Sequence, residues 1–522
     1  MPGKIRLYAN TIRYMKPEQI FWRIGKKLGI KCALKGAHPT AVGHTLTPAV
    51  PELDLDPVFL RRFCVEELMQ DRVTFLHETE QFDWEGSWHI DGRSHLWNFN
   101  LHYFEYLHPL AAQYLESSDR RYLDKTAQMI RSWIRQNPME QGGDGWSAYT
   151  ISLRLTNWMA YFSYVGTKLD QNFREEVEES LFRQYAYLSD HLEKDILGNH
   201  YFENLKALVL CALYFGDAQS LSIYLSAFRK ECREEILTDG MHFERSPMYH
   251  KIVLEGLLRV TAALRQAQMA DRELEQLARA MLDAACSMEM GVHQTPLFND
   301  SGDNVAKSLT ALQDAAKRHL GMVPTLREAL PESGYYFFTN GPWKLIVDAG
   351  AVGPDYIPGH SHCDAMSFEL YQDGQPVLVN CGTYAYQHES RHWFRSTQAH
   401  NTVQESGTEQ SEIWSTFRLA RRSRTRVLEV LDNGIRMEMT DYHGHHICRE
   451  IRLLPDALLI RDWADGLELQ SHLHSIEQIE INSSADLMRS EAVYAPEYGL
   501  LQTIHQITAI GKGSIELNIP LA

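Results

Sequence analysis

The sequence predicts an α+β protein of several domains, in which a helical part is followed by an antiparallel β part. From about Leu101 to Ala329, apolar residues recur every three or four positions, which is the spacing of amphipathic helices. After Pro331 the period changes to two, and Asn-Gly or Asp-Gly pairs separate strand-like runs, as they do in hairpins. The length of 522 residues accommodates about two to four domains.

The predicted elements fall into three consecutive segments. Residues 1–60 form an N-terminal extension with one short basic helix and then a loop over residues 36–57. Residues 61–330 form a helical domain, because Gly, Asp, Asn and Pro separate successive helical runs there. Residues 331–522 form stacked antiparallel sheets or a β-sandwich, with hairpin turns at Asn340-Gly341, Asp373-Gly374 and Asn433-Gly434.

Composition argues against several classes of protein. The chain has 51 Lys and Arg residues against 68 Asp and Glu residues, and its net charge of −17 weighs against nucleic acid as a partner. The eight Cys residues form no C-x-x-C pair and are expected to be reduced thiols. No apolar stretch approaches the roughly 20 residues of a membrane span, and no secretory signal is visible. We therefore expect no membrane insertion and a cytoplasmic protein, or a periplasmic or secreted one if a leader is missing, while the oligomeric state stays open.

Histidine is about twice as frequent as in average proteins, with 24 residues, and four loop-like segments combine it with Tyr, Asn or Arg. In the first segment, Asn199 and His200 follow Gly198, where a helix-capping role is the alternative. In the second, Pro247 should begin a helix and place Tyr249 in its first turn, where a structural role is the alternative.

The third and fourth segments lie in the β part. His360 and His362 are two positions apart, so both imidazoles face the same way if this segment is a strand, although two histidines alone are a weak metal signal. Arg391, Arg395 and His400 share a polar run that is alternatively a solvated face.

The residue types in these segments favour one reaction over others. Candidate carboxylate pairs are few, which argues against a glycosidase, and no nucleophile elbow, phosphate-binding loop or dinucleotide fingerprint is apparent. Tyr, His and Asn suit β-elimination at a uronic acid, in which the carboxylate is neutralised, a base removes the C5 proton and an acid protonates the departing glycosidic oxygen. Trp97 and Trp146 lie in aromatic segments suited to stacking on sugar rings, with burial as the alternative.

Seven segments resemble, in order and over roughly residues 70–420, the heparinase II/III superfamily of polysaccharide lyases. They are WNFNLHYFEYL, GWSAYTISLRLTNW, GNHYFENLKAL, DGMHFERSPMYH, FNDSGD, GHSHCDAMSFEL and VNCGTYAYQHESRHWFRSTQAHNTV. The resemblance implies an N-terminal incomplete (α/α) toroid followed by a C-terminal antiparallel β-sandwich. It also implies an anionic polysaccharide or oligosaccharide substrate of the heparan sulfate, chondroitin sulfate, hyaluronan or alginate type, and no organic cofactor.

The resemblance also implies roles for single residues. Asn199 and His200 would neutralise the uronate and assist proton transfer, Tyr249 would be the base or the acid, and His360 would reach the substrate from the β domain. The positions of a structural metal site are His362, Asn380 and His400. Asparagine at 380 departs from the usual aspartate and weakens the ligand set, and Zn is favoured there over Mn.

Four arginines complete the expected site, as anion contacts in a cleft between the two domains. They are Arg154, Arg245, Arg391 and Arg395. The net charge repels a polyanion at long range, but screening over about 8 Å at physiological salt would let a locally basic cleft prevail. Two other functions stay open: a uronate C5-epimerase of the same fold, and a non-catalytic glycan-binding or capsule-assembly protein.

Overall fold

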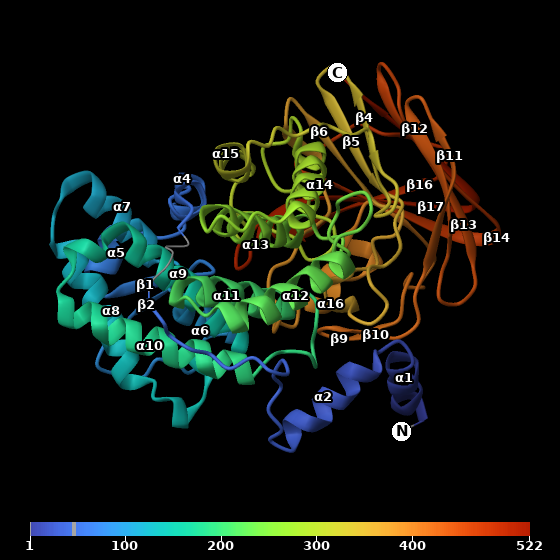
Figure 1. Ribbon diagram of the computed structural model, residues 1–522. Coiled ribbons are helices and arrows are strands. Elements are labelled where there is room, and N and C mark those ends of the chain that lie inside the picture. The colour runs from blue at the N-terminus through green and yellow to red at the C-terminus, as the bar shows by residue number, and fades with distance from the viewer. Residues whose placement is uncertain (1, 44–48, 522) are drawn as a thin grey trace.

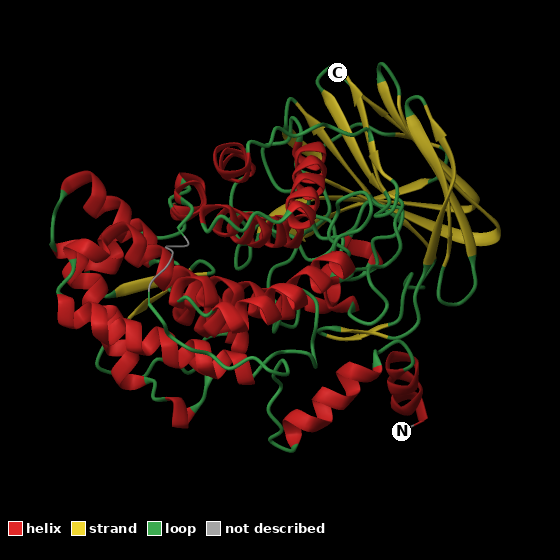
Figure 2. Ribbon diagram, in the orientation of Figure 1, coloured by secondary structure: helices red, strands yellow, loops and turns green. Residues whose placement is uncertain are grey.

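Helices occupy the first part of the chain and strands the second (Figures 1 and 2). The computed structural model describes residues 2–43 and 49–521. The change from helix to strand falls between α15 (Leu309–Leu320) and β3 (Ala329–Leu330), which confirms the predicted order of a helical part before an antiparallel β part. None of the helices in the described ranges combines the length and hydrophobicity that a membrane span requires.

The helical part is built around α11 (Asn199–Phe215). Every residue of α11 except His200 is buried, as expected for a helix that is apolar on all sides. It packs against α9 (Ala148–Val165), α12 (Ala218–Glu235) and α13 (Pro247–Gln266). Around these lie α6 (His95–Tyr103), α7 (Leu107–Ser117), α8 (Arg121–Gln136), α10 (Gln171–Asp190) and α14 (Arg272–Glu289), with the small hairpin of β1 (Arg72–Phe75) and β2 (Glu78–Gln81).

The β part is one network of antiparallel strands, which hydrogen bonds connect across 13 strands of the described chain. Its main path runs through β11 (Arg424–Leu431), β12 (Gly434–Thr440), β13 (His446–Leu453), β14 (Ala457–Ser475), β7 (Gln375–Leu378), β6 (Phe368–Gln372), β5 (Trp343–Asp348), β4 (Tyr335–Asn340) and β3. The long β17 (Gln502–Pro520) pairs with β14 and β16 (Asp486–Tyr494). All three predicted hairpin turns are confirmed, because each lies between two paired strands.

The N-terminal extension differs from the prediction. It holds two helices, α1 (Pro2–Ile12) and α2 (Pro17–Lys27), where one was expected, because Pro17 starts a second helix. The predicted loop over residues 36–57 contains the one-turn α3 (Pro51–Asp54), and its residues 44–48 lie outside the described residues.

The extension connects the two parts of the molecule. The amide of Gln19 on α2 donates to the carbonyl of Ile196 in the helical part and to that of Tyr356 in the β part, at 3.1 and 3.3 Å. Tyr8 on α1 packs edge-on against Trp414 in β9 (Ile413–Ser415), with ring centroids 5.0 Å apart. Both helices lie beside β9 and β10 (Arg418–Leu419) in Figure 1.

Candidate active site

A cleft of about 640 Å³ lies where the helical part, the β part and α2 meet. Residues of α9, α11 and α13 line it from the helical side, and the loop around Pro358 lines it from the β side. The four residues expected to be catalytic, Asn199, His200, Tyr249 and His360, all line this one cleft. The structure therefore brings together groups that are up to 161 positions apart in the sequence.

Asn199 and His200 begin α11 because Gly198 permits the turn before it. Gly198 has a φ of +58°, and a Cβ there would lie 2.7 Å from a carboxylate oxygen of Glu244. The Oδ1 atom of Asn199 is buried and has no hydrogen-bond partner in the described chain. A substrate group that donates a hydrogen bond, such as a sugar hydroxyl, would satisfy this oxygen.

His200 is paired with the buried carboxylate of Glu193. Its Nδ1 lies 3.2 Å from Oε1 of Glu193, whose other oxygen accepts from Asn204 at 3.0 Å. Enclosure alone would lower the pKa of His200, but the carboxylate of Glu193 outweighs it and raises the pKa above the ordinary value of 6.5. The raised pKa favours the imidazolium form, in which the nitrogen on the free side of the ring is also an N–H donor.

Tyr249 and His360 face each other across the domain boundary. Ser246 caps α13 by accepting from the backbone N–H of Tyr249, which places this residue in the first turn, as predicted. The rings of Tyr249 and His360 lie 4.0 Å apart between centroids. Burial raises the pKa of Tyr249 well above 10, so its hydroxyl keeps its proton at neutral pH.

A chain of hydroxyls continues from Tyr249 into the β part. The hydroxyl of Tyr249 lies 2.7 Å from that of Tyr386, which lies 2.8 Å from that of Tyr498. Sequence analysis missed Tyr386 and Tyr498, because only the fold places residues so distant in the sequence next to Tyr249.

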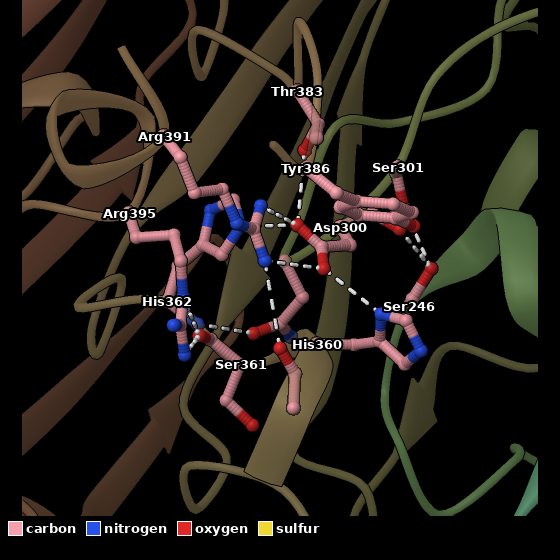
Figure 3. Close-up of polar contacts among 12 residues, drawn as sticks. Ser246, Asp300, Ser301, His360, Ser361, His362, Thr383, Tyr386, Arg391 and Arg395 are labelled. Carbon is pink, nitrogen blue, oxygen red and sulfur yellow. Dashed lines mark hydrogen bonds and ion pairs between the residues drawn. The ribbon is translucent and has the colours of Figure 1, made fainter. Parts of the chain in front are cut away.

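Asp300 organises the β side of the site (Figure 3). One of its carboxylate oxygens bonds to Nδ1 of His360 and the other to Nε2 of His362, each at 2.8 Å. Arg391 donates to both oxygens. Burial alone would raise the pKa of Asp300, but the guanidinium of Arg391 holds it well below its usual range. Asp300 is thus a buried carboxylate that fixes two imidazoles, and the sequence analysis did not single it out.

The segment that holds His360 and His362 is not a strand, so the condition for their alternation is not met. His360 ends a short 3-10 helix, Pro358–His360, and His362 follows in a loop before β6. The two imidazoles still converge, because each bonds to a different oxygen of the Asp300 carboxylate. The neighbouring carboxylate of Glu244 lies 3.9 Å from Nε2 of His360 and has no hydrogen-bond partner within the described residues.

Three residues expected to bind substrate lie in the core of the helical part instead. Trp97 is fully buried and donates to the carbonyl of Glu78, and Trp146 is 8% exposed and donates to that of Asn137. Arg154 is fully buried and donates to Gln184 and to the carbonyl of Gly145, each at 2.7 Å. None of the three lines the cleft, because their hydrogen-bonding groups are used inside the helical part.

The other three predicted arginines do not line the cleft either. Arg391 forms an ion pair with Asp300. Arg395 is fully buried and donates to carbonyls that include those of Ser361 and Ser415. Arg245 donates to backbone carbonyls of the β part. None of the three lines the cleft, so the structure does not bring them together with the four expected catalytic residues. The alternative of a solvated face for residues 391–403 is wrong, because Arg391, Arg395 and His400 are buried.

Other charged residues line the cleft. The cations are Arg23, Arg62, Lys206, Lys307 and Arg418, and the acids are Glu105, Asp195, Glu203 and Glu255. These five cations and four acids almost balance, and protonated His200 adds one positive charge, so the cleft is less basic than expected. Glu203 and Lys206 form an ion pair on the otherwise mostly apolar α11. Two opposite charges three positions apart in an apolar helix were the sequence signal that could have identified them as cleft residues.

The predicted metal ligands supply two imidazole nitrogens. His400 Nδ1 bonds to the carbonyl of Ser396, which only accepts, so its Nε2 carries a lone pair. His362 Nε2 faces the Asp300 carboxylate, so its Nδ1 also carries a lone pair, and these two nitrogens face each other at 3.1 Å. Burial lowers both pKa values to about 4, which keeps the rings neutral. Such a donor pair fits a divalent cation.

The third predicted ligand is weaker. Oδ1 of Asn380 already accepts from the backbone N–H of Asn401 at 3.1 Å. Among the described residues, no group of three or more His, Cys, Asp or Glu side chains could hold a metal ion. The residues therefore fit a cation through two imidazoles, without the anionic ligand that an aspartate at position 380 would supply.

Comparison with known proteins agrees with the two-part fold. Residues 60–322 match the heparinase II/III N-terminus, and residues 322–503 match the heparinase II/III-like C-terminal region. Curated relatives are heparin-sulfate lyases from Pedobacter heparinus (23% identical over 362 residues, 62% of this chain and 54% of that protein) and Bacteroides thetaiotaomicron (21% over 408 residues, 66% and 56%). The chain spans about half the length of these relatives.

Solved structures share the fold over most of the chain. A heparinase III structure aligns with a TM-score of 0.68 and 16% identity, over 97% of this chain and 92% of its own. Heparan sulfate lyase from Pedobacter heparinus aligns with a TM-score of 0.59 and 17% identity, over 96% and 87%. A chondroitin AC lyase from Streptomyces coelicolor aligns with a TM-score of 0.51 and 11% identity, over 90% and 79%.

Proposed function

The chain belongs to the heparinase II/III family, and we propose that it is a polysaccharide lyase that cleaves uronate-containing glycosaminoglycan chains by β-elimination. The observation that supports this most is the 4.0 Å contact between the rings of Tyr249 and His360, in a cleft that Asn199 and His200 also line. A neutral phenol, an imidazole, an imidazolium and an amide meet there, and these are the groups that the reaction requires.

The first step is to make the C5 proton of the uronate acidic. The imidazolium of His200 and the side-chain amide of Asn199 bind the substrate carboxylate and stabilise the negative charge that develops on it. Because Glu193 keeps His200 charged, this stabilisation is in place before the substrate arrives.

The second step moves two protons. The Nδ1–H of His360 donates a hydrogen bond to Asp300. Its Nε2 therefore carries a lone pair and acts as the base that takes the C5 proton. The C4–O4 bond breaks with its electron pair on O4, a C4–C5 double bond forms, and Tyr249 gives its proton to O4. The tyrosinate then recovers a proton from the imidazolium of His360. The Glu244 carboxylate lies close enough to stabilise that imidazolium.

The geometry favours glucuronate over iduronate. The rings of Tyr249 and His360 are in contact, with centroids 4.0 Å apart, so the acid and the base approach the sugar ring from one side. In a glucuronate residue the C5 hydrogen and O4 lie on the same side of the ring, whereas in iduronate they lie on opposite sides. The nearly balanced charge of the cleft also favours chains with few sulfates, such as hyaluronan, unsulfated chondroitin and the glucuronate regions of heparan sulfate.

The proposal is tested by incubating the protein with hyaluronan, chondroitin, dermatan, heparan sulfate and alginate while ultraviolet absorbance of the new double bond is followed. We expect absorbance to rise with at least one glucuronate-containing chain and to stay much lower with iduronate-rich dermatan. In heavy water, deuterium at C5 without a rise in absorbance would instead identify a C5-epimerase. Binding without either change would identify a glycan-binding protein.

Replacing Glu193 with glutamine should move the alkaline limb of the pH profile of kcat/KM to lower pH. The carboxylate raises the pKa of His200, and catalysis needs the imidazolium, so activity is lost as pH rises through that pKa. The ion pair likewise adds stability below the unfolded-state pKa of His200 and loses it as pH rises through the folded-state pKa. An unchanged alkaline limb, measured beside a Glu176→Gln surface control, would rule out this role for His200.

We also propose that His362 and His400 hold a divalent cation, Zn rather than Mn. The cation would supply structural support to the loop that carries His360. Elemental analysis of the purified protein should find the metal, and His400→Ala should lower both its amount and the melting temperature. The control is His446→Ala at an exposed strand position. A wild-type protein that neither retains added Zn or Mn nor gains stability from it would contradict the proposal.

A further inference from the structure

The outer face of the N-terminal extension carries an apolar stripe on each of its two helices. On α1 the stripe is Ile5, Tyr8 and Ile12, of which Tyr8 also contacts Trp414 along one edge, and on α2 it is Phe21 and Ile24, continued by Leu28 at the C-cap. These side chains are between 50% and 71% exposed, and their spacing of three and four residues puts each set on one side of its helix. A monomeric soluble protein rarely exposes so many large apolar groups within one short segment.

Other side chains anchor both helices to the body of the protein. Gln19, on the side of α2 opposite its stripe, is buried, and Thr11 on α1 accepts a hydrogen bond from the indole of Trp414 at 3.1 Å. The extension is therefore a fixed element whose large apolar side chains stay at least half exposed. Figure 1 shows α1 and α2 at the edge of the molecule, with their outer sides uncovered.

Basic residues surround these stripes, in contrast to the rest of the chain. The first 35 residues contain one acidic residue, Glu18, and nine basic ones: Lys4, Arg6, Arg13, Lys16, Arg23, Lys26, Lys27, Lys31 and Lys35. The whole chain nevertheless has a net charge of −17, so this segment is its positive end. Lys4, Arg6 and Lys27 are exposed and form no ion pair within the described residues.

We propose that the outer faces of α1 and α2 bind peripherally to an anionic lipid bilayer. An amphipathic helix that is apolar on one side and rich in Lys and Arg beside it lies flat in the headgroup region, with the apolar side chains entering the lipid and the cations meeting the phosphates. The two helices together provide the apolar side chains that enter the lipid and the cations that meet the phosphates, and no helix has to cross the membrane. The same α2 lines the cleft through Gln19 and Arg23, so binding would place the cleft beside the bilayer surface.

The test is sedimentation of the full chain with lipid vesicles. We expect the protein to bind vesicles of phosphatidylcholine and phosphatidylglycerol but not of phosphatidylcholine alone, and to be released progressively as the salt concentration rises. The triple variant Lys4→Glu, Arg6→Glu, Lys27→Glu should bind at least about tenfold more weakly. The triple variant Ile5→Ser, Ile24→Ser, Leu28→Ser should lose the binding that persists at high salt.

Matched controls carry the same changes at exposed positions elsewhere. They are Lys317→Glu, Arg424→Glu and Lys512→Glu for charge, and Val323→Ser, Val430→Ser and Met488→Ser for the apolar groups. Neither control triple should change vesicle binding by more than about twofold. Absence of binding to anionic vesicles, or equal losses in the test and control triples, would overturn the proposal. Self-association that the Ile5, Ile24, Leu28 triple abolishes, without vesicle binding, would show that a second copy covers this surface instead.

Discussion

Tyr249→Phe should lower kcat by about a hundredfold or more while leaving the fold intact. The change removes one hydroxyl, which within the described residues bonds only to that of Tyr386, and leaves the ring in contact with that of His360. The hydroxyl is the only proton donor beside His360 that the mechanism uses for O4, and its raised pKa keeps that proton available. Initial rates over a range of substrate concentrations, measured as double-bond absorbance, give kcat and KM separately, and KM should change little.

Two further variants make this result specific. Tyr356→Phe removes a hydroxyl that lines the same cleft but bonds to Glu234, and it should keep most of the activity. Tyr386→Phe removes the partner that orients the hydroxyl of Tyr249, and its effect on kcat should lie between the other two. If Tyr249→Phe stays as active as Tyr356→Phe, Tyr249 is not the acid and the proposed mechanism is wrong.

The sequence predicts the order of the parts well because periodicity and turn chemistry are local. The three hairpin turns and the helix that starts at Pro247 each depend on residues within a few positions of one another, and all are confirmed. For residues 1–60 the sequence analysis predicts one short basic helix, whereas the structure has a second helix that starts at Pro17.

The candidate site was harder to predict, because it depends on which groups the tertiary fold leaves free. Arg154 and Arg391 could bind an anion, but in the structure they donate hydrogen bonds to the buried groups Gln184 and Asp300. Asp300 stands in an ordinary-looking polar loop, and its importance appears only when His360, His362 and Arg391 converge on it from elsewhere in the chain. Burial and long-range pairing of this kind leave no periodic trace in a single sequence.

Asp300→Ala should be the most damaging single change in the β side of the site. The change leaves the guanidinium of Arg391 buried without its counter-charge, which costs about 3–5 kcal/mol of unfolding free energy. It also removes the group that holds Nδ1 of His360, so the base loses its orientation and activity should fall with stability. Denaturant unfolding measures the first effect, and double-bond absorbance under conditions where the variant is folded measures the second.

A second substitution separates these two effects. In the double variant Asp300→Ala with Arg391→Met, no unpaired charge is left in the interior, so much of the stability should return. Activity should not return, because His360 still lacks its carboxylate partner. Glu179→Ala, which breaks an exposed pair with Arg183, is the control and should cost less than about 0.5 kcal/mol. Recovery of activity together with stability would mean that Asp300 supports the fold alone and does not position the base.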